Sequence, residues 1–231
     1  MPTVYLIPSL LHEEGIAAIP NYIIDAVKNC QVFFVENERT ARRYLKQLWK
    51  DMVIDNYEWF NMTDESKMIE TFKQKIKEGK HIGIISEAGC PGVADPGQVL
   101  VTIAQQMDIE VKPLVGPNSI LLALMASGMN GQRFQFVGYL PIDNHERNKA
   151  IKELEAGSKK KNCTQIFIET PYRNNQMIEA LLKNCNATTR LCIAVDLTGK
   201  TEWIKTKIIA DWKKEKLDIH KRLAIFLFLA Q

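Results

Sequence analysis

Apolar residues along this chain fall alternately into short continuous runs and into helical spacing. Short runs rich in β-branched and aromatic residues are typical of buried strands, and apolar residues every three or four positions predict helices. In the first half, the runs predict strands over residues 4–7, 31–35, 81–85 and 110–114, separated by helices over residues 22–27, 39–49, 65–78 and 97–106. This alternation predicts a parallel sheet with helices on both faces.

The pattern changes between residues 130 and 145. Asn130-Gly131-Gln132 has the composition of a turn, and Pro141-Ile142-Asp143-Asn144 interrupts the apolar pattern. Beyond it, the chain predicts helices over residues 145–156 and 174–184, strands over 164–169 and 190–196, and two runs that could pair, 203–209 and 223–229. The higher share of strand indicates an α+β unit with a mixed sheet. We expect two domains, residues 1–115 and 116–231.

Composition restricts the class of protein only weakly. The 231 residues are 46% hydrophobic and 25% charged, which is ordinary for a globular protein, and a net charge of +3 permits an anionic partner without requiring one. Five cysteines without Cys-x-x-Cys spacing, and a first strand that begins almost at Met1, predict reduced thiols and a cytoplasmic location. Scattered histidines predict no metal site, and the longest apolar run is too short to cross a bilayer, so we expect no membrane partner.

The loop after the predicted strand over residues 81–85 carries the clearest chemical signal. It runs Ser-Glu-Ala-Gly-Cys-Pro-Gly-Val-Ala-Asp-Pro-Gly from residue 86 to residue 97 and leads into a predicted helix. Open α/β sheets bind ligands outside the carboxyl ends of their strands, and glycines let a ligand approach the backbone closely. The loop has neither Gly-x-Gly-x-x-Gly nor Gly-Lys-Ser/Thr, which disfavours a dinucleotide site or a P-loop. We therefore expect another kind of ligand pocket here.

Four segments, in one order, resemble those of a known enzyme family. The loop over residues 86–97 is similar to the Ser-Asp-Ala-Gly-Thr-Pro-x-x-x-Asp-Pro-Gly loop of the tetrapyrrole-methylase-like (class III) S-adenosylmethionine-dependent methyltransferases. Residues 115–128, 136–141 and 167–173 resemble later segments of the branch that methylates a cytidine 2′-hydroxyl in small-subunit ribosomal RNA. The resemblance implies a two-lobed α/β fold, in which a mostly parallel, doubly wound N-terminal sheet and a C-terminal α+β mixed sheet flank a cleft. It also implies a homodimer.

The same resemblance implies S-adenosylmethionine as the cofactor, touched by several backbone segments of both lobes. The residues that it places at the cofactor are Leu10, Ala88, Gly89, Cys90, Val93, Asn118, Ser119, Ile168, Glu169, Ala194 and Leu197.

Two glutamates, Glu87 and Glu169, stand at the ends of apolar runs and are candidates for acid–base chemistry. Methyl transfer to a hydroxyl needs an oriented nucleophile and help in losing a proton. Glu87 is the predicted catalytic carboxylate, although the family has the shorter Asp at this place. The alternative for either glutamate is a structural role, in which the carboxylate accepts backbone N–H bonds in a tight loop.

Basic residues indicate the substrate class. Arg39, Arg42 and Arg43 open a predicted helix and suit phosphate contacts, while Tyr172 and Arg173 follow a strand and suit unstacked bases. We therefore expect ribosomal RNA as the partner, with a solvated helix side as the alternative for Arg42 and Arg43 together with Lys46.

The first loop departs from the family pattern. Residues 8–15 read Pro-Ser-Leu-Leu-His-Glu-Glu-Gly, where the rRNA branch has Pro-Thr-Pro-Ile-Gly-Asn-Leu, so a glycine beside the cofactor is missing. We predict an S-adenosylmethionine-dependent methyltransferase that acts on ribose 2′-hydroxyls of ribosomal RNA. The alternatives are methylation of a tetrapyrrole or other small molecule, and a degenerate member that binds the cofactor or RNA without turnover.

Overall fold

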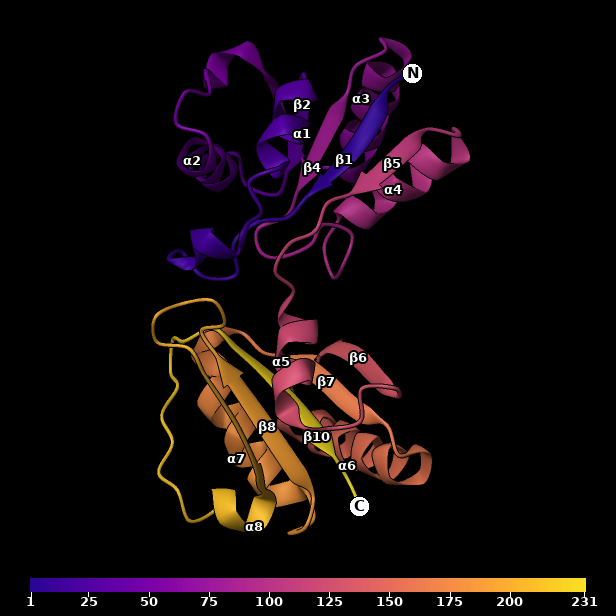
Figure 1. Ribbon diagram of the computed structural model, residues 1–231. Helices are drawn as coiled ribbons and strands as arrows, with labels where there is room; N and C mark the ends of the chain where they lie inside the picture. The colour runs from indigo at the N-terminus through magenta and orange to yellow at the C-terminus, as the bar shows by residue number, and fades with distance from the viewer. The chain divides into compact units, whose positions relative to one another are not determined.

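A five-stranded parallel sheet organises the first of two units in the computed structural model, which describes residues 1–231 (Figure 1). This unit spans Met1–Asn118. The strand order is β3-β2-β4-β1-β5, and every neighbouring pair is parallel. The strands are β1 (Thr3–Ile7), β2 (Val32–Val35), β3 (Glu58–Asn61), β4 (Ile82–Ile85) and β5 (Glu110–Pro113).

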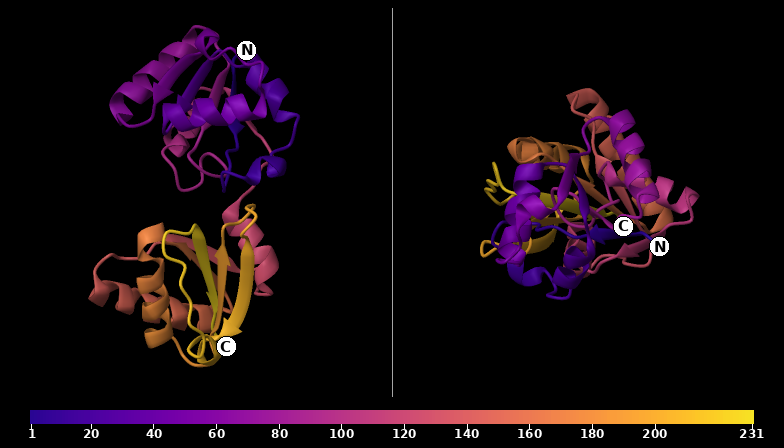
Figure 2. Two further views of the ribbon diagram at one scale, coloured as in Figure 1. Left: turned by 90° about the vertical axis from the view of Figure 1, so that its left-hand side faces the viewer. Right: turned by 90° about the horizontal axis from the view of Figure 1, so that it is seen from above.

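Helices cover both faces of this sheet, as Figures 1 and 2 show. Because side chains alternate along a strand, Phe33 and Val35 pack against α1 (Ile23–Asn29) and α2 (Glu38–Leu48), whereas Phe34 packs on the opposite face. That opposite face is covered by α3 (Glu65–Lys77) and α4 (Gly97–Gln106). The doubly wound parallel sheet predicted for this half is therefore confirmed.

A mixed sheet organises the second unit, Ser119–Gln231. Its order is β6-β7-β10-β8-β9; β6 and β7 are parallel, and the other pairs are antiparallel. The mixed sheet predicted for this half is thus confirmed. The strands are β6 (Phe134–Tyr139), β7 (Thr164–Ile168), β8 (Arg190–Val195), β9 (Trp203–Ile208) and β10 (Ala224–Leu229).

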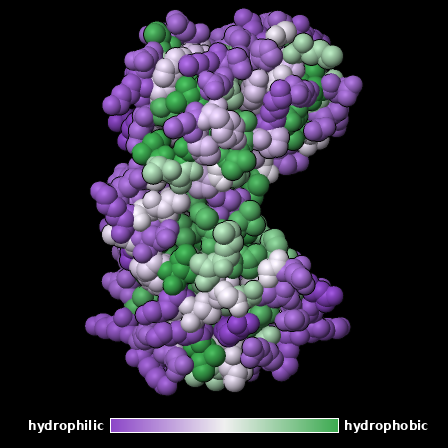
Figure 3. Space-filling model, viewed as in Figure 1, coloured by the Kyte–Doolittle hydropathy of each residue, from purple (hydrophilic) through white to green (hydrophobic).

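The two faces of the mixed sheet are covered unequally. A large apolar core joins one face to α6 (Asn144–Lys161), α7 (Asn174–Asn184) and the short α8 (Ile209–Trp212). The other face carries only α5 (Ser119–Ser127), whose carbonyl at Ser127 accepts a hydrogen bond from Thr206 Oγ1 at 2.9 Å (Figure 2). Apolar residues gather over α5 in Figure 3, where Leu121 and Met125 are exposed.

Besides the four-residue helix α8, three elements were not predicted from the sequence. Strand β3 is a short, half-exposed edge strand, and α5 is apolar on nearly every side, so neither shows a clear period. Strand β6 contains Gly138, whose φ is +71°, and its pairing with β7 shifts register between Phe136 and Tyr139. Helix α6 also ends at Lys161 rather than at residue 156, and Asn162 caps it with a left-handed φ of 48°.

Three 3₁₀ turns complete the chain: Gly15–Ala18, Ile54–Asn56 and Pro171–Arg173. None of the helices combines the length and the apolar character that a membrane span requires.

Candidate functional site

The loops after β1 and β4 meet at the switch point of the parallel sheet. From β1 the chain crosses over β4 to β2, and from β4 it crosses over β1 to β5, so the crossovers leave these adjacent strands in opposite directions. Open α/β sheets bind ligands at such a point. Ser9 joins the two loops, because its N–H donates to the Gly89 carbonyl at 2.8 Å and its Oγ donates to the Glu87 carbonyl at 3.4 Å.

The loop after β5 packs against the same two loops. Cys90 Sγ lies 3.6 Å from the carbonyl oxygen of Pro117. A Cβ at Gly116 would fall 2.1 Å from Cβ of Pro8, so this close approach of two loops requires glycine. Of the residues predicted at the cofactor, four lie in the loop after β4: Ala88, Gly89, Cys90 and Val93. The contacts above bring this loop together with the segments after β1 and β5.

The loop after β1, whose sequence differs from the family pattern, places two leucines at this site. Gly89 is buried, and a Cβ built on it would lie 3.2 Å from Cδ2 of Leu11, so the Leu11 side chain covers its α-carbon. Leu10, predicted to contact the cofactor, is half-buried and packs against the core under α1 and α2. Ala88 and Val93 are the exposed members of the predicted set.

Three acids, Glu36, Glu87 and Asp95, gather at this edge without a basic partner; we call them the acidic edge. Glu36 Oε1 accepts a hydrogen bond from the Glu87 N–H at 2.7 Å, and Glu87 Oε1 accepts one from Thr40 Oγ1 at 2.5 Å. Asp95 Oδ1 caps the Gly97 N–H at 2.7 Å, while its Oδ2 is buried with no partner. Burial raises the pKa of Glu36, the negative charges of Asp95 and Glu87 raise it further, and the Glu87 N–H bond opposes them.

The arginines of α2 divide into two kinds. Helix α2 begins beside the acidic edge, where Asn37 Oδ1 accepts the N–H of Arg39 at 3.0 Å. Arg42 pairs with Glu38 and lies 5.1 Å from the centroid of the Trp59 ring. Arg39 and Arg43 are exposed, and their guanidinium groups form no ion pair. Two of the three predicted phosphate-binding arginines are thus free to bind an anion.

In the second unit, the predicted cofactor residues lie at one edge of the mixed sheet, where β7 and β8 end. Ile168 and Ala194 both pair with Ile225 on the strand between them, so they share the face that carries α5. Leu197 is buried just beyond β8. Ser119 is the first residue of α5. The other end of α5 lies over the opposite end of β8 and β9, because the Gly128 carbonyl accepts a hydrogen bond from Arg190 at 3.1 Å.

The acids at this second edge are bound to arginines. Glu169 is 5% exposed, and its Oε1 accepts bonds from the Thr170 N–H at 2.6 Å and from Arg173 Nε and Nη2 at 2.9 and 2.6 Å. Arg173 is therefore committed to Glu169, whereas Tyr172 is 68% exposed. Glu169 Oε2 is buried without a partner, so this carboxylate retains an acceptor for a ligand N–H or O–H.

Asp196 and Arg222 form the second such pair, and we call Glu169 and Asp196 with their arginines the paired edge. Arg222 donates to Asp196 Oδ2 through Nε at 2.8 Å and Nη2 at 2.6 Å, and Thr201 Oγ1 donates to the same atom at 2.7 Å. Burial alone would raise the pKa of Asp196, but the Thr201 and Arg222 hydrogen bonds hold it below its ordinary value.

Sequence reasoning missed Glu36, Asp95 and Asp196 as members of these edges. Glu36 and Asp196 each follow a buried strand directly, as Glu87 follows β4, so the same signal applied to β2 and β8 would have found them. No group of three histidines, cysteines or acids has the geometry to hold a metal ion.

Comparison with known proteins places these features in a family. The sequence profile of Tetrapyrrole (Corrin/Porphyrin) Methylases matches residues 23–210. A protein of Buchnera aphidicola subsp. Schizaphis graminum named "Ribosomal RNA small subunit methyltransferase I" is 29% identical over 229 residues, which cover 97% of this chain and 77% of the relative. Proteins of the same name from Vibrio cholerae and Bacillus subtilis are 27% and 30% identical, covering 91% and 87% of this chain and 70% and 66% of their own lengths.

Two solved structures share the fold. The methyltransferase CobJ superposes with a TM-score of 0.64 at 14% identity, covering 99% of this chain and 93% of its own. The uroporphyrin-III-C-methyltransferase from Thermus thermophilus superposes with a TM-score of 0.58 at 15% identity, covering 99% and 94%. At these identities the likeness establishes the two-sheet architecture alone.

Proposed function

Because the chain belongs to the family of tetrapyrrole (corrin/porphyrin) methylases, we propose that it transfers a methyl group from S-adenosylmethionine to a ribose 2′-hydroxyl of small-subunit ribosomal RNA. Family membership makes it a methyltransferase. The observation that supports RNA as the acceptor is the name shared by relatives that match nearly the whole chain, since each of them is called a ribosomal RNA small subunit methyltransferase.

Each edge, taken by itself, has residues that suit a part of the proposed cofactor. An adenosyl group offers ribose O–H and adenine N–H donors, and Glu169 Oε2 and Asp95 Oδ2 are buried acceptors that lack a donor. Ala88 and Val93 expose the loop after β4, and Ile168, Ala194 and Leu197 offer an apolar wall for the adenine ring. When bound, the cofactor would supply an electrophilic methyl group on a sulfonium.

The acidic edge supplies the group that would handle the proton. A 2′-hydroxyl becomes a better nucleophile when a carboxylate accepts a hydrogen bond from it, and general-base help of this kind contributes about 10²- to 10⁴-fold. Glu87 is exposed, unpaired with any cation and positioned through Thr40, so we assign it this role. Glu36 holds the Glu87 backbone in place, and Arg39 and Arg43 on the adjoining helix would bind phosphates of the RNA.

Methyl transfer from labelled S-adenosylmethionine tests this proposal. Isolated small subunits, protein-free ribosomal RNA and a set of tetrapyrroles are offered separately, and labelled RNA is digested to nucleosides. We expect label in RNA, in a 2′-O-methylated nucleoside. Label in a tetrapyrrole, or on a nucleobase, would contradict the proposed acceptor.

One observation favours a second candidate, a member that binds its ligand without turnover. The first loop places Leu11 against Gly89, where the related branch has a loop with a glycine. Binding of S-adenosylhomocysteine, seen as a rise in melting temperature, together with no label transferred to any acceptor, would support this candidate instead.

The homodimer and the cytoplasmic location predicted above remain proposals. Sedimentation velocity over a range of protein concentrations tests the dimer, and a single monomer boundary at micromolar protein would refute it.

A further inference from the structure

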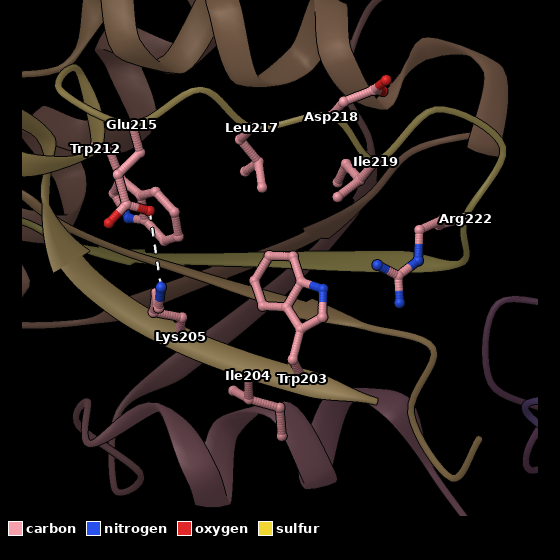
Figure 4. Close-up of a pocket in the computed structure, with 9 residues that line it drawn as sticks. All are labelled: Trp203, Ile204, Lys205, Trp212, Glu215, Leu217, Asp218, Ile219 and Arg222. Atoms are coloured by element: carbon pink, nitrogen blue, oxygen red, sulfur yellow. Dashed lines mark ion pairs between the residues drawn. The ribbon is translucent and has the colours of Figure 1, made fainter. Parts of the chain in front are cut away.

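A cavity of about 310 Å³ opens in the second unit between β9 and the segment that leads from α8 to β10 (Figure 4). Trp203 points from β9 toward Leu217 and Ile219, which line the opposite wall. The volume is at the lower end of the range for small-molecule sites, which suits one flat ring system rather than a large ligand.

This cavity is separate from the residues predicted at the cofactor. Trp203 pairs with Val195, whose side chain belongs to the core under α6 and α7. Ile168 and Ala194 face the other side of the sheet, where α5 lies. Because side chains alternate along a strand, the cavity lies on the opposite face of the sheet from Ile168 and Ala194.

The segment that lines the cavity carries a net positive charge. Residues 200–222 contain eight lysines and arginines against four acids, a net charge of +4, whereas the whole chain has a net charge of +3. The remaining residues therefore sum to −1. Lys213, Lys216 and Lys221 are exposed, and none of them forms an ion pair. A concentration of positive charge on one segment is the electrostatic footprint of an anionic partner.

A second aromatic ring, the exposed Tyr172, lies beside this segment. The Tyr172 ring packs edge-on against His220 with centroids 5.9 Å apart, and Lys221 Nζ lies 5.9 Å from the Tyr172 centroid. The Lys221 N–H donates to the Pro171 carbonyl at 2.9 Å, which fixes Lys221 in the left-handed region with a φ of 63°. Such a φ is uncommon for a residue other than glycine. Lys221 thus lies beside the Tyr172 ring, and the next residue, Arg222, lines the cavity together with Trp203.

We propose that this cavity binds an unpaired nucleobase of the RNA substrate, stacked on Trp203, while Tyr172 stacks a neighbouring base and Lys221 and the exposed lysines contact the intervening phosphates. The inference rests on RNA being the acceptor. Aromatic faces that alternate with cations bind single strands, because each base offers a ring to stack and each linkage offers a phosphate. Base-paired RNA cannot place a base in such a cavity without unpairing it.

Binding of the full chain to a short fluorescein-labelled single-stranded RNA tests this proposal. Trp203→Leu keeps an apolar side chain against the core and removes the stacking surface, and we expect it to weaken binding about 5- to 150-fold. Tyr172→Leu should act in the same direction. Lys221→Gln should lower the slope of log affinity against log salt concentration by about one, as loss of one phosphate contact predicts. Lys152→Gln, an exposed lysine of α6, is the control and should leave the affinity within about 2-fold.

Two outcomes separate the failure of this inference from failure of the proposed function. If Trp203→Leu binds as wild type does while a double Arg39→Gln, Arg43→Gln variant loses affinity, RNA remains the substrate and the cavity is not its binding site. If wild type binds no RNA and methylates a tetrapyrrole, both proposals fall.

Photo-cross-linking keeps the test independent of folding of the Trp203 variant. RNA that carries 5-bromouridine, irradiated with the wild-type protein, should cross-link to Trp203 or Tyr172. Cross-links confined to other residues would overturn the proposal.

Discussion

The two sheets differ in how they hold the acids at the edges where the predicted cofactor residues lie. At the paired edge, Glu169 and Asp196 are each held by an arginine, Arg173 and Arg222, and are nearly inaccessible to water. At the acidic edge, Glu36, Glu87 and Asp95 accept hydrogen bonds only from backbone N–H groups and a hydroxyl, and no cation pairs with them.

This difference separates acids whose charge is held by an arginine from acids that can exchange a proton with a ligand. A carboxylate paired with a buried guanidinium is stabilised in its charged form and gains little by binding a proton. Acids without cations lack this stabilisation; at Glu36 burial raises the pKa, and the charges of Asp95 and Glu87 raise it further. A base beside these acids can exchange a proton with a hydroxyl. Of the two glutamates that the sequence offers as candidates, the geometry therefore favours Glu87.

Loss of Arg173 should have the largest effect on stability. Arg173→Ala leaves the Glu169 carboxylate buried without its counter-ion, and breaking a buried pair in this way costs about 3–5 kcal/mol of the free energy of unfolding. Urea unfolding followed by circular dichroism measures this cost. Arg39→Ala, which removes an exposed arginine without an acid partner, should change the free energy of unfolding by less than about 0.5 kcal/mol. Equal effects of the two changes would remove the distinction between the edges.

Removal of the Glu87 charge should have the largest effect on the reaction. Glu87→Gln keeps the shape and the acceptor for Thr40, and we expect the rate of methyl transfer to fall by ~100-fold or more while cofactor affinity stays near wild type. Single-turnover rates and S-adenosylhomocysteine titration separate the two quantities. Glu169→Gln is the matched change at the paired edge. Equal loss of affinity and rate in Glu87→Gln would place Glu87 at the cofactor instead.

The sequence predicts the two-unit fold well and predicts the site only in part. Runs such as residues 31–35 and 81–85 are buried on both faces of the sheet, so their apolar composition alone identifies them as strands. Strand β3 is half-exposed and α5 is apolar on nearly every side, so neither shows a periodic pattern of apolar residues that would identify it. Two of the predicted arginines pair with acids, Arg173 with Glu169 and Arg42 with Glu38. Whether such a pair forms depends on the direction that each side chain takes after a strand or along a helix. Neither motif nor charge count distinguishes a committed arginine from a free one.

Shortening Leu11 tests whether the first loop covers the backbone of the loop after β4 at Gly89. Leu11→Ala removes the side chain that contacts Gly89, so we expect S-adenosylhomocysteine to bind several-fold more tightly, seen as a larger ligand-induced rise in melting temperature. Val53→Ala, which trims an exposed side chain on the connection between α2 and β3, is the control for general effects on stability. Weaker binding by Leu11→Ala would show that Leu11 itself contacts the cofactor.

The smallest effect we predict is a difference in pH dependence between the two edges. The raised pKa of Glu36 means that, above about pH 4.3, the ordinary pKa of glutamate, the folded protein holds this proton more tightly than the unfolded chain does. Glu36 therefore lowers the free energy of unfolding as pH rises through this window. Asp196 has a lowered pKa, so its contribution is present at neutral pH and is lost as pH falls below about 3.9.

Urea unfolding between acidic and neutral pH measures both contributions. Relative to wild type, Glu36→Gln should gain stability as pH rises, because the amide still accepts the Glu87 N–H and carries no charge beside Glu87 and Asp95. Asp196→Asn should be destabilised at neutral pH and should approach wild type only in acid, where Asp196 itself becomes protonated. Parallel curves for wild type and Glu36→Gln would mean that neither burial nor the neighbouring acids raise the pKa of Glu36, and the contrast between the two edges would then rest on the arginine pairs alone.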